Sequence, residues 1–214
     1  MVELYRRHAW YASGMIFWMF NDCWPASLGW AFVDYYLRRK PSYYTFKRLS
    51  SDAVGSVDAY GKTLTVSNTS DLGITASISV RALDMKRDFA EVARLDECAI
   101  MMPYSTESYD VSGLTKSDDI LLVIDVDTDE GSYRSYYKKG KLNVKRHDGF
   151  EIISKDEGSV TIRANTYLQA VELEGDYTFS DNYFAMLNGE EKVVTFEKFS
   201  DKADGVTVKS YTLM

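Results

Sequence analysis

The chain has 214 residues, of which 45% are hydrophobic and 27% are charged, and its formal net charge is -7. This is the composition of an ordinary globular protein, long enough for one large or two small domains. The net negative charge argues against nucleic-acid binding, and no Lys/Arg cluster is backed by an aromatic platform. The apolar run at 15–20 is far too short to span a bilayer, and residues 1–8 lack the pattern of a signal peptide. We therefore expect neither a nucleic-acid nor a membrane partner.

The first fifty residues differ in composition from the rest of the chain. All four tryptophans lie within the first thirty residues. Apolar spacing predicts the end of a helix over 1–14, closed by Gly14, and a second helix over 41–49 with a proline in its first turn. Residues 15–20 are apolar at every position, which is typical of a strand buried on both faces of a parallel sheet. This segment therefore predicts one α/β repeat whose partner strands lie elsewhere.

From residue 51 onward the hydrophobic pattern has a period of two. Short alternating or continuously apolar runs are separated by polar turns, as in antiparallel β-sandwiches. The clearest runs cover 62–66, 74–80, 120–126 and 159–164. The spacing leaves room for two sandwiches, which we predict over 51–136 and 137–214.

Cysteine and acidic residues give little indication of a metal or cofactor. Cys23 and Cys98 are far apart and match no metal-binding spacing, and a disulfide between them is not implied. The acidic run 125–130 lacks the spacing of a calcium-binding EF-hand loop and is better explained as a solvated strand end and turn. We expect no catalytic residues, no metal and no cofactor in this chain.

The residues that follow the predicted strand form the candidate binding site. Trp18, Asn21, Asp22 and Trp24 cluster around its carboxyl end, which is the catalytic face in an α/β barrel. A tryptophan ring can stack on the C–H face of a sugar, and neighbouring amide and carboxylate groups can bind its hydroxyls. By residue pattern alone, core tryptophans and a capping turn remain the alternative.

Two motifs in this order resemble glycoside hydrolase family 2. The first is FWMFNDCWP at 17–25, followed by Trp30 and by KPSYYTFKR at 40–48. It resembles the end of the catalytic barrel in the β-mannosidases, where W-x-x-N-D-C-W-P occupies the eighth strand. The exo-β-glucosaminidase branch has a related N-N-x-W-P segment. Asp22 and Cys23 favour the mannosidase branch.

The second motif lies far downstream. It comprises FSDNYF at 179–184 and LNGEEK at 187–192, and it resembles the S-D-N-[FY]-F-x-L-x-P-G-E motif of the C-terminal sandwich in those enzymes. Asn188 stands where the family usually has proline. The resemblance implies a mainly β chain. Two immunoglobulin-like antiparallel β-sandwiches would follow the last strand and helices of a (β/α)8 barrel, with that barrel end at 1–50.

The resemblance also implies a function. Enzymes of this family are retaining glycosidases that use two glutamates about 5–5.5 Å apart. The expected parent enzyme is an exo-glycosidase acting on terminal β-D-mannosides. Trp18 would form the floor of the −1 sugar subsite, and Asn21, Asp22 and Trp24 would line or brace it. Neither an Asn-Glu nor a Glu-Phe-Gly segment occurs here, and Glu3 matches no catalytic position. We therefore expect the chain by itself to be inactive.

Other functions remain open at this stage. The chain could be a carbohydrate-binding or protein-interaction sandwich, or part of an exo-β-glucosaminidase or a β-galactosidase-like enzyme. The expected partners are a terminal β-mannoside and the remainder of the catalytic barrel. Because an isolated barrel end exposes apolar surface, we expect residues 1–50 to pack on the first sandwich, to pair with a second copy as a homodimer, or to be partly disordered.

Overall fold

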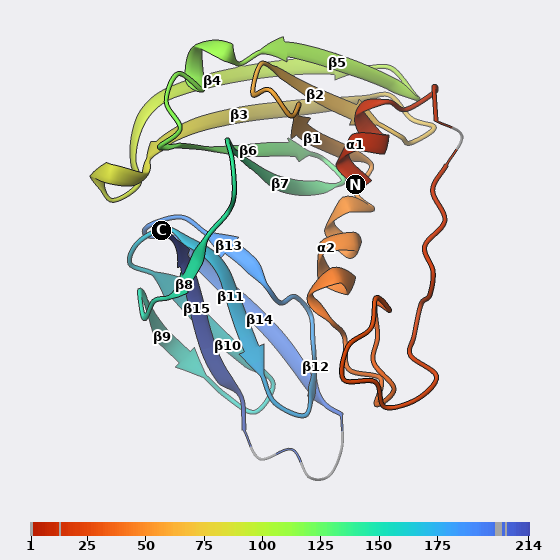
Figure 1. Cartoon of the computed structure of the whole chain (residues 1–214), viewed down its shortest axis with the longest axis vertical. Helices are drawn as coiled ribbons and strands as arrows, with labels where there is room; N and C mark the ends of the chain where they lie inside the picture. The colour runs from red at the N-terminus through yellow and green to blue at the C-terminus, as the bar shows by residue number, and fades with distance from the viewer. Residues whose placement is uncertain (1, 13, 200–202, 204) are drawn as a thin grey trace. The chain divides into compact units, whose positions relative to one another are not determined.

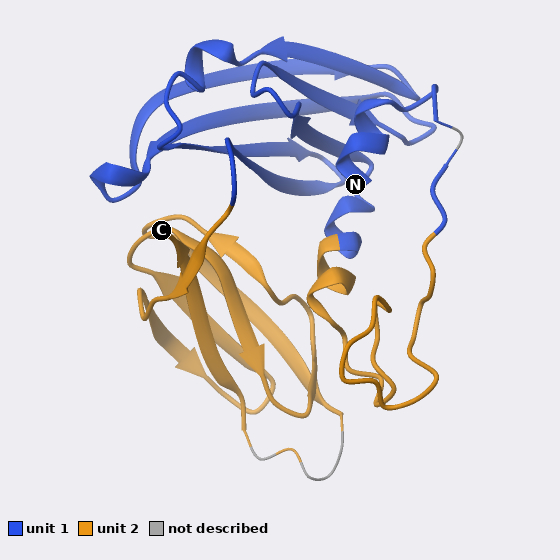
Figure 2. Cartoon of the chain, in the orientation of Figure 1, with its two compact units in different colours: residues 1–16, 46–141 blue, residues 17–45, 142–214 orange. Residues whose placement is uncertain are grey.

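The computed structural model describes residues 2–12, 14–199, 203 and 205–214 (Figure 1). The chain divides into two compact units, each made of two separate stretches (Figure 2). The first unit contains residues 1–16 and 46–141, and the second contains residues 17–45 and 142–214. Among the described residues, no helix combines the length and the apolarity that a membrane crossing needs.

Two helices occur near the start of the chain. Helix α1 (Val2–Arg7) ends well before Gly14, so the prediction of a helix continuing to residue 14 is wrong. Hydrogen bonds tie α1 to the first unit. Arg6 donates to the carbonyls of Leu49, Ser51 and Asp52 at 3.2, 3.0 and 2.8 Å. Helix α2 (Pro41–Leu49) begins at the proline, as predicted.

The first unit contains two antiparallel sheets. One has the strand order β1-β2-β5 and the other has the order β4-β3-β6-β7. The strands are β1 (Ala53–Val57), β2 (Thr63–Asn68), β3 (Ile74–Asp84), β4 (Ala90–Met101), β5 (Ser105–Asp110), β6 (Ile120–Thr128) and β7 (Gly131–Lys138), and the short 3-10 turns are η1 (Met85–Arg87) and η2 (Ser112–Leu114). The period-two pattern holds along β3, where Ala76, Ile78 and Val80 are buried. Their side chains meet those of Leu64 and Ile124 in one core.

The second unit contains another pair of antiparallel sheets, with strand orders β13-β11-β15-β8 and β12-β14-β10-β9. Their strands are β8 (Val144–Arg146), β9 (Phe150–Lys155), β10 (Ser159–Ala164), β11 (Leu168–Glu174), β12 (Tyr177–Phe179), β13 (Phe184–Met186), β14 (Glu191–Lys198) and β15 (Thr207–Leu213). The core between these sheets includes Ile162, Leu168, Phe184 and Val194. The chain is thus mainly β and built of antiparallel sheets, as predicted from its hydrophobic pattern.

The second sequence motif has a structural role in this sandwich. The side chain of Asn182 accepts from the backbone N–H of Leu173 and donates to its carbonyl, both at 2.8 Å. Asp181 pairs with Lys192 at 2.6 Å. The motif therefore joins β11, the turn before β13 and β14.

The predicted buried strand at 15–20 is not formed. Residues 14–20 have no regular structure, and Ile16, Trp18 and Phe20 are largely exposed. A parallel strand is stable only when neighbouring strands satisfy its backbone and cover its faces. No strand of the described residues pairs with this run, so the expected barrel element is not visible.

Candidate functional site

The segment between residues 17 and 40 folds back on itself beside α2. The backbone N–H of Asp22 donates to the carbonyl of Val33 at 3.0 Å, and the N–H of Val33 donates to Phe20 at 3.0 Å. The N–H of Lys40 donates to the carbonyl of Phe32 at 2.9 Å. Three short extended pieces therefore lie side by side and position the residues that follow Phe20.

A buried ion pair closes this fold. Lys40 Nζ lies 2.6 Å from Asp22 Oδ2, and the two side chains are 24% and 8% exposed. The same ammonium group donates to the carbonyl of Gly29 at 3.4 Å. A Cβ atom at position 29 would lie 2.7 Å from Asp22 Oδ1, which is closer than real Cβ contacts allow. The loop between residues 22 and 40 therefore depends on the ion pair and on glycine at position 29.

A cavity of about 450 Å³ lies within this loop. We call it the tryptophan cup; its lining residues are Met19, Asp22, Cys23, Trp24, Ala26, Leu28, Gly29 and Trp30. Trp24 and Trp30 are 63% and 76% exposed, so their indole faces are open to a ligand. Asp22 is the one carboxylate among these lining residues. A cup of this composition offers flat apolar faces and one buried polar group, which suits a ligand with an apolar face and hydroxyl edges.

The structure brings together part of the predicted site. Asp22 and Trp24 both line the tryptophan cup. Trp18 is not among the lining residues and is 78% exposed, and the peptide bond that joins it to Met19 is cis. Asn21 is also outside the lining, and its side-chain amide donates to the carbonyl of Asp22 at 3.2 Å.

Trp30 was missing from the sequence-based site. It lies on the wall of the cup, together with Cys23. Two signals could have indicated it: the clustering of all tryptophans in the first thirty residues, and the place of Trp30 in the first family motif. No spacing rule links Trp30 to Asp22, because the backbone pairing of the loop and the Asp22–Lys40 pair bring them together.

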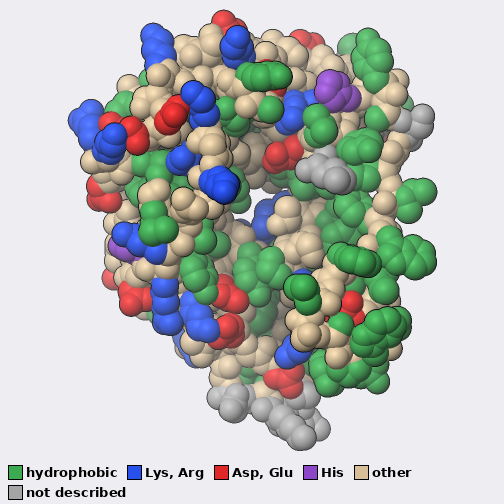
Figure 3. Space-filling view, in the orientation of Figure 1, with side chains coloured by type: hydrophobic (Ala, Val, Ile, Leu, Met, Phe, Trp, Pro, Cys, Tyr) green, Lys and Arg blue, Asp and Glu red, His purple; other side chains and the backbone are tan. Residues whose placement is uncertain are grey.

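Hydrophobic side chains are concentrated on the surface of this segment (Figure 3). Between residues 17 and 37, the large hydrophobic side chains that are at least 48% exposed are Trp18, Phe20, Trp24, Leu28, Trp30, Tyr35, Tyr36 and Leu37. Contiguous apolar surface of this kind normally marks an interaction site. Cys23 and Cys98 are both free and exposed. Among the described residues, no group of three or more His, Cys, Asp or Glu side chains is placed to hold a metal ion.

Three comparisons with known proteins agree on one group. The Ig_mannosidase family, an Ig-fold domain, matches residues 143–213. A stretch of 46 residues is 50% identical to beta-mannosidase B of Aspergillus niger and covers 21% of this chain and 5% of that protein. The crystal structure of a β-D-mannosidase from Dictyoglomus thermophilum superposes with a TM-score of 0.66 at 16% identity, covering 98% of this chain and 27% of that chain. An exo-chitosanase from Amycolatopsis orientalis gives 0.62 at 16% identity, over 94% and 31%.

The sheets and these likenesses show the fold: the chain is similar to the C-terminal region of family 2 glycoside hydrolases. Its sequence is similar to the β-mannosidases, which confirms the resemblance predicted from the two motifs. The chain spans less than a third of the length of the solved enzymes that it matches.

Proposed function

We propose that this chain is the C-terminal part of a retaining exo-glycosidase that hydrolyses terminal β-D-mannosides. The observation that carries the proposal is the 46-residue stretch that is 50% identical to beta-mannosidase B. The exposed aromatic surface of residues 17–37 supports it, because this surface needs a cover and the rest of a catalytic barrel would supply one.

In this proposal, the tryptophan cup contributes one wall of the sugar pocket. Trp24 offers an open indole face, and Asp22 braces the loop through Lys40. Trp18 would form the floor of the −1 subsite once neighbouring barrel strands cover it, and Asn21 would hold the turn beside it. The two glutamates that perform the reaction would come from earlier barrel strands, so the chain alone would bind but not cleave.

The coding sequence upstream of Met1 tests this proposal directly. Barrel strands that carry Asn-Glu and Glu-Phe-Gly segments would support it. A stop codon or an unrelated domain in that position would contradict it.

Enzyme assays distinguish the proposed hydrolysis of β-mannosides from the alternative hydrolysis of β-glucosaminides. We expect no turnover of p-nitrophenyl β-mannoside by the 214-residue chain, and enzyme-like turnover would refute the proposed inactivity. The protein extended by its upstream residues should hydrolyse the mannoside. A preference of that extended protein for the β-glucosaminide would favour the exo-β-glucosaminidase branch, whose fold the exo-chitosanase shares with this chain.

The association state tests the proposed cover. If the remainder of the barrel is the natural partner of the 17–37 surface, the isolated chain should self-associate weakly through this surface. The extended protein should not self-associate through it, because the barrel would cover it. A tight dimer of the extended protein that Trp24→Ala abolishes would instead favour a homodimer. Sedimentation velocity of both proteins distinguishes the two.

A further inference from the structure

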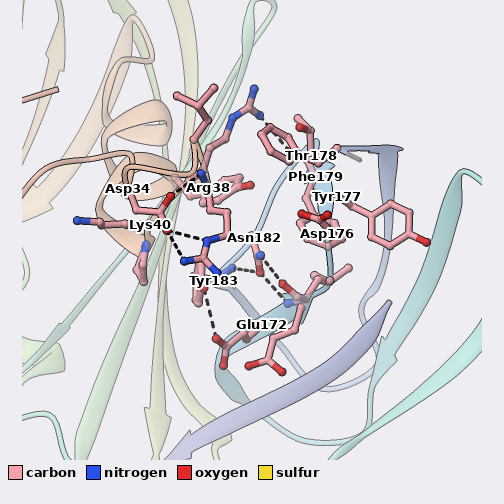
Figure 4. A pocket seen from close by; sticks show the side chains of 18 residues that line it. Asp34, Arg38, Lys40, Glu172, Asp176, Tyr177, Thr178, Phe179, Asn182 and Tyr183 are labelled. Atoms are coloured by element: carbon pink, nitrogen blue, oxygen red, sulfur yellow. Dashed lines mark hydrogen bonds and ion pairs between the residues drawn. The ribbon is translucent and has the colours of Figure 1, made fainter. Parts of the chain in front are cut away.

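A second cavity lies in the second unit, outside the tryptophan cup. Its volume is about 590 Å³, within the range of small-molecule sites. One wall is the segment 34–41, and the other is the connection from β11 to β12, two strands of different sheets, with the turn at 182–183 (Figure 4). We call it the β11–β12 pocket. Neither the proposed hydrolysis nor the tryptophan cup uses it.

Two of the three cations on the basic wall of the β11–β12 pocket, Arg38 and Lys40, are already in ion pairs. Arg38 Nε donates to Asp34 Oδ2 at 2.7 Å, and the backbone N–H of Arg38 donates to Oδ1 of the same carboxylate at 2.9 Å. Lys40 is paired with Asp22 at 2.6 Å. The guanidinium group of Arg39 lies 4.9 Å from the ring centre of Tyr43. The charges of Arg38 and Lys40 are therefore compensated within the protein, and Arg39 donates to the carbonyl of Phe179 at 3.4 Å.

On the opposite wall, two glutamate side chains are likewise hydrogen-bonded or ion-paired within the protein. Glu172 accepts from the hydroxyls of Tyr183 at 3.3 Å and Tyr211 at 2.8 Å. Glu174 pairs with Lys209 at 2.6 Å. Burial raises the pKa of Tyr183 well above its ordinary value, so its hydroxyl stays protonated and keeps donating to Glu172. Each carboxylate retains free lone pairs, because two oxygens can accept about four hydrogen bonds.

Tyr183 is held in a conformation that is uncommon for a bulky residue. Its φ is 54°, in the left-handed region, and its N–H donates to Asn182 Oδ1 at 2.9 Å. Such backbone is retained where the surroundings over-determine it, and it clusters at binding sites. The second sequence motif thus shapes a wall of this pocket in addition to joining β11 and β14.

We propose that the β11–β12 pocket is a second binding site and that its ligand is a neutral saccharide. Fixed planar polar groups on both walls can bind pairs of hydroxyls, which donate and accept at once. The rings of Tyr177 and Tyr183 add apolar faces. Because the charges of Arg38, Lys40 and Glu174 are paired within the protein, an inorganic ion that binds one of these groups would have to break an existing ion pair, whereas a sugar would not.

Calorimetric titration of the complete chain with β-1,4-mannobiose and cellobiose tests this inference. We expect a Kd on the order of 1 mM or tighter for at least one disaccharide. Arg38→Ala and Glu172→Gln should each weaken it about tenfold or more. Both side chains are at least partly exposed, so the two variants should fold. Lys139→Ala, which removes an exposed ion pair with Asp118 in the other unit, is the matched control and should bind as the parent does.

Trp24→Ala distinguishes this inference from the proposed function. Binding that survives Trp24→Ala but is weakened by Arg38→Ala and Glu172→Gln supports a saccharide site in the β11–β12 pocket. Binding that Trp24→Ala abolishes and the pocket variants leave intact would place the sugar in the tryptophan cup and overturn the inference while supporting the proposed function. Absence of disaccharide binding, or tighter binding of inorganic phosphate than of either sugar, would also overturn it.

Discussion

Replacing Lys40 by methionine should loosen the loop of the tryptophan cup without disturbing the sandwiches. The substitution keeps an unbranched side chain but removes the ammonium group that lies 2.6 Å from Asp22. Breaking a buried ion pair from one side costs about 3–5 kcal/mol, because the remaining charge is left without a partner. Asp22 is 8% exposed, but Lys40 is 24% exposed, so water can replace part of the interaction. We therefore expect a cost at or just below that range, about 2–3 kcal/mol.

Tryptophan fluorescence is the appropriate assay, because all four tryptophans lie in the first thirty residues and none lies in a strand. Fluorescence during urea unfolding reports on this region, and far-UV circular dichroism reports mainly on the strands. For Lys40→Met, we expect the fluorescence midpoint to fall by about 1 M urea, at a slope of 1–3 kcal/mol/M. The circular dichroism midpoint should change much less.

Two controls make the test specific. Lys139→Met breaks a solvent-exposed pair at 2.9 Å and should shift neither midpoint measurably. The double variant Asp22→Asn with Lys40→Met removes both charges and should recover much of the loss. If Lys40→Met leaves the fluorescence transition in place, or shifts both transitions equally, the ion pair does not hold the cup and the reasoning fails.

Two further predictions concern the sandwiches. Asn182→Ala removes both hydrogen bonds to buried Leu173 and should cost about 2–4 kcal/mol, lowering the melting temperature by circular dichroism, whereas exposed Asn188→Ala should leave it unchanged. Burial raises the pKa of Tyr133, whose hydroxyl donates to Glu3 Oε1 at 3.2 Å. The neutral form of Tyr133 is therefore favoured in the folded state. Its contribution to the free energy of unfolding is complete below pH about 10 and is lost as the pH rises above that value. Tyr133→Phe should flatten this alkaline loss in urea midpoints, and an unchanged pH profile would contradict the assignment.

Local sequence patterns predicted the helices and strands that depend on neighbouring residues or on a pattern that repeats along the chain. Helix α2 begins at Pro41 because proline suits a first helical turn and its missing N–H needs no partner there. Strand β3 alternates buried and exposed residues because successive side chains of a strand point to opposite faces. The run at 120–126, which is apolar except for Asp125, lies in β6, an inner strand of its sheet.

The amino-acid sequence by itself determined the β-rich class, the position of α2 and the resemblance to the β-mannosidases, because each depends on residues close together in the chain. Only the tertiary structure determined the conformation and contacts of the aromatic segment at the start of the chain. It left residues 15–20 without a strand, buried Asp22 against Lys40, and placed Trp30 rather than Trp18 on the wall of the cup. It also formed the β11–β12 pocket from segments more than a hundred residues apart. Strand pairing, buried charges and cavities all depend on partners distant in the chain, which a local pattern does not specify.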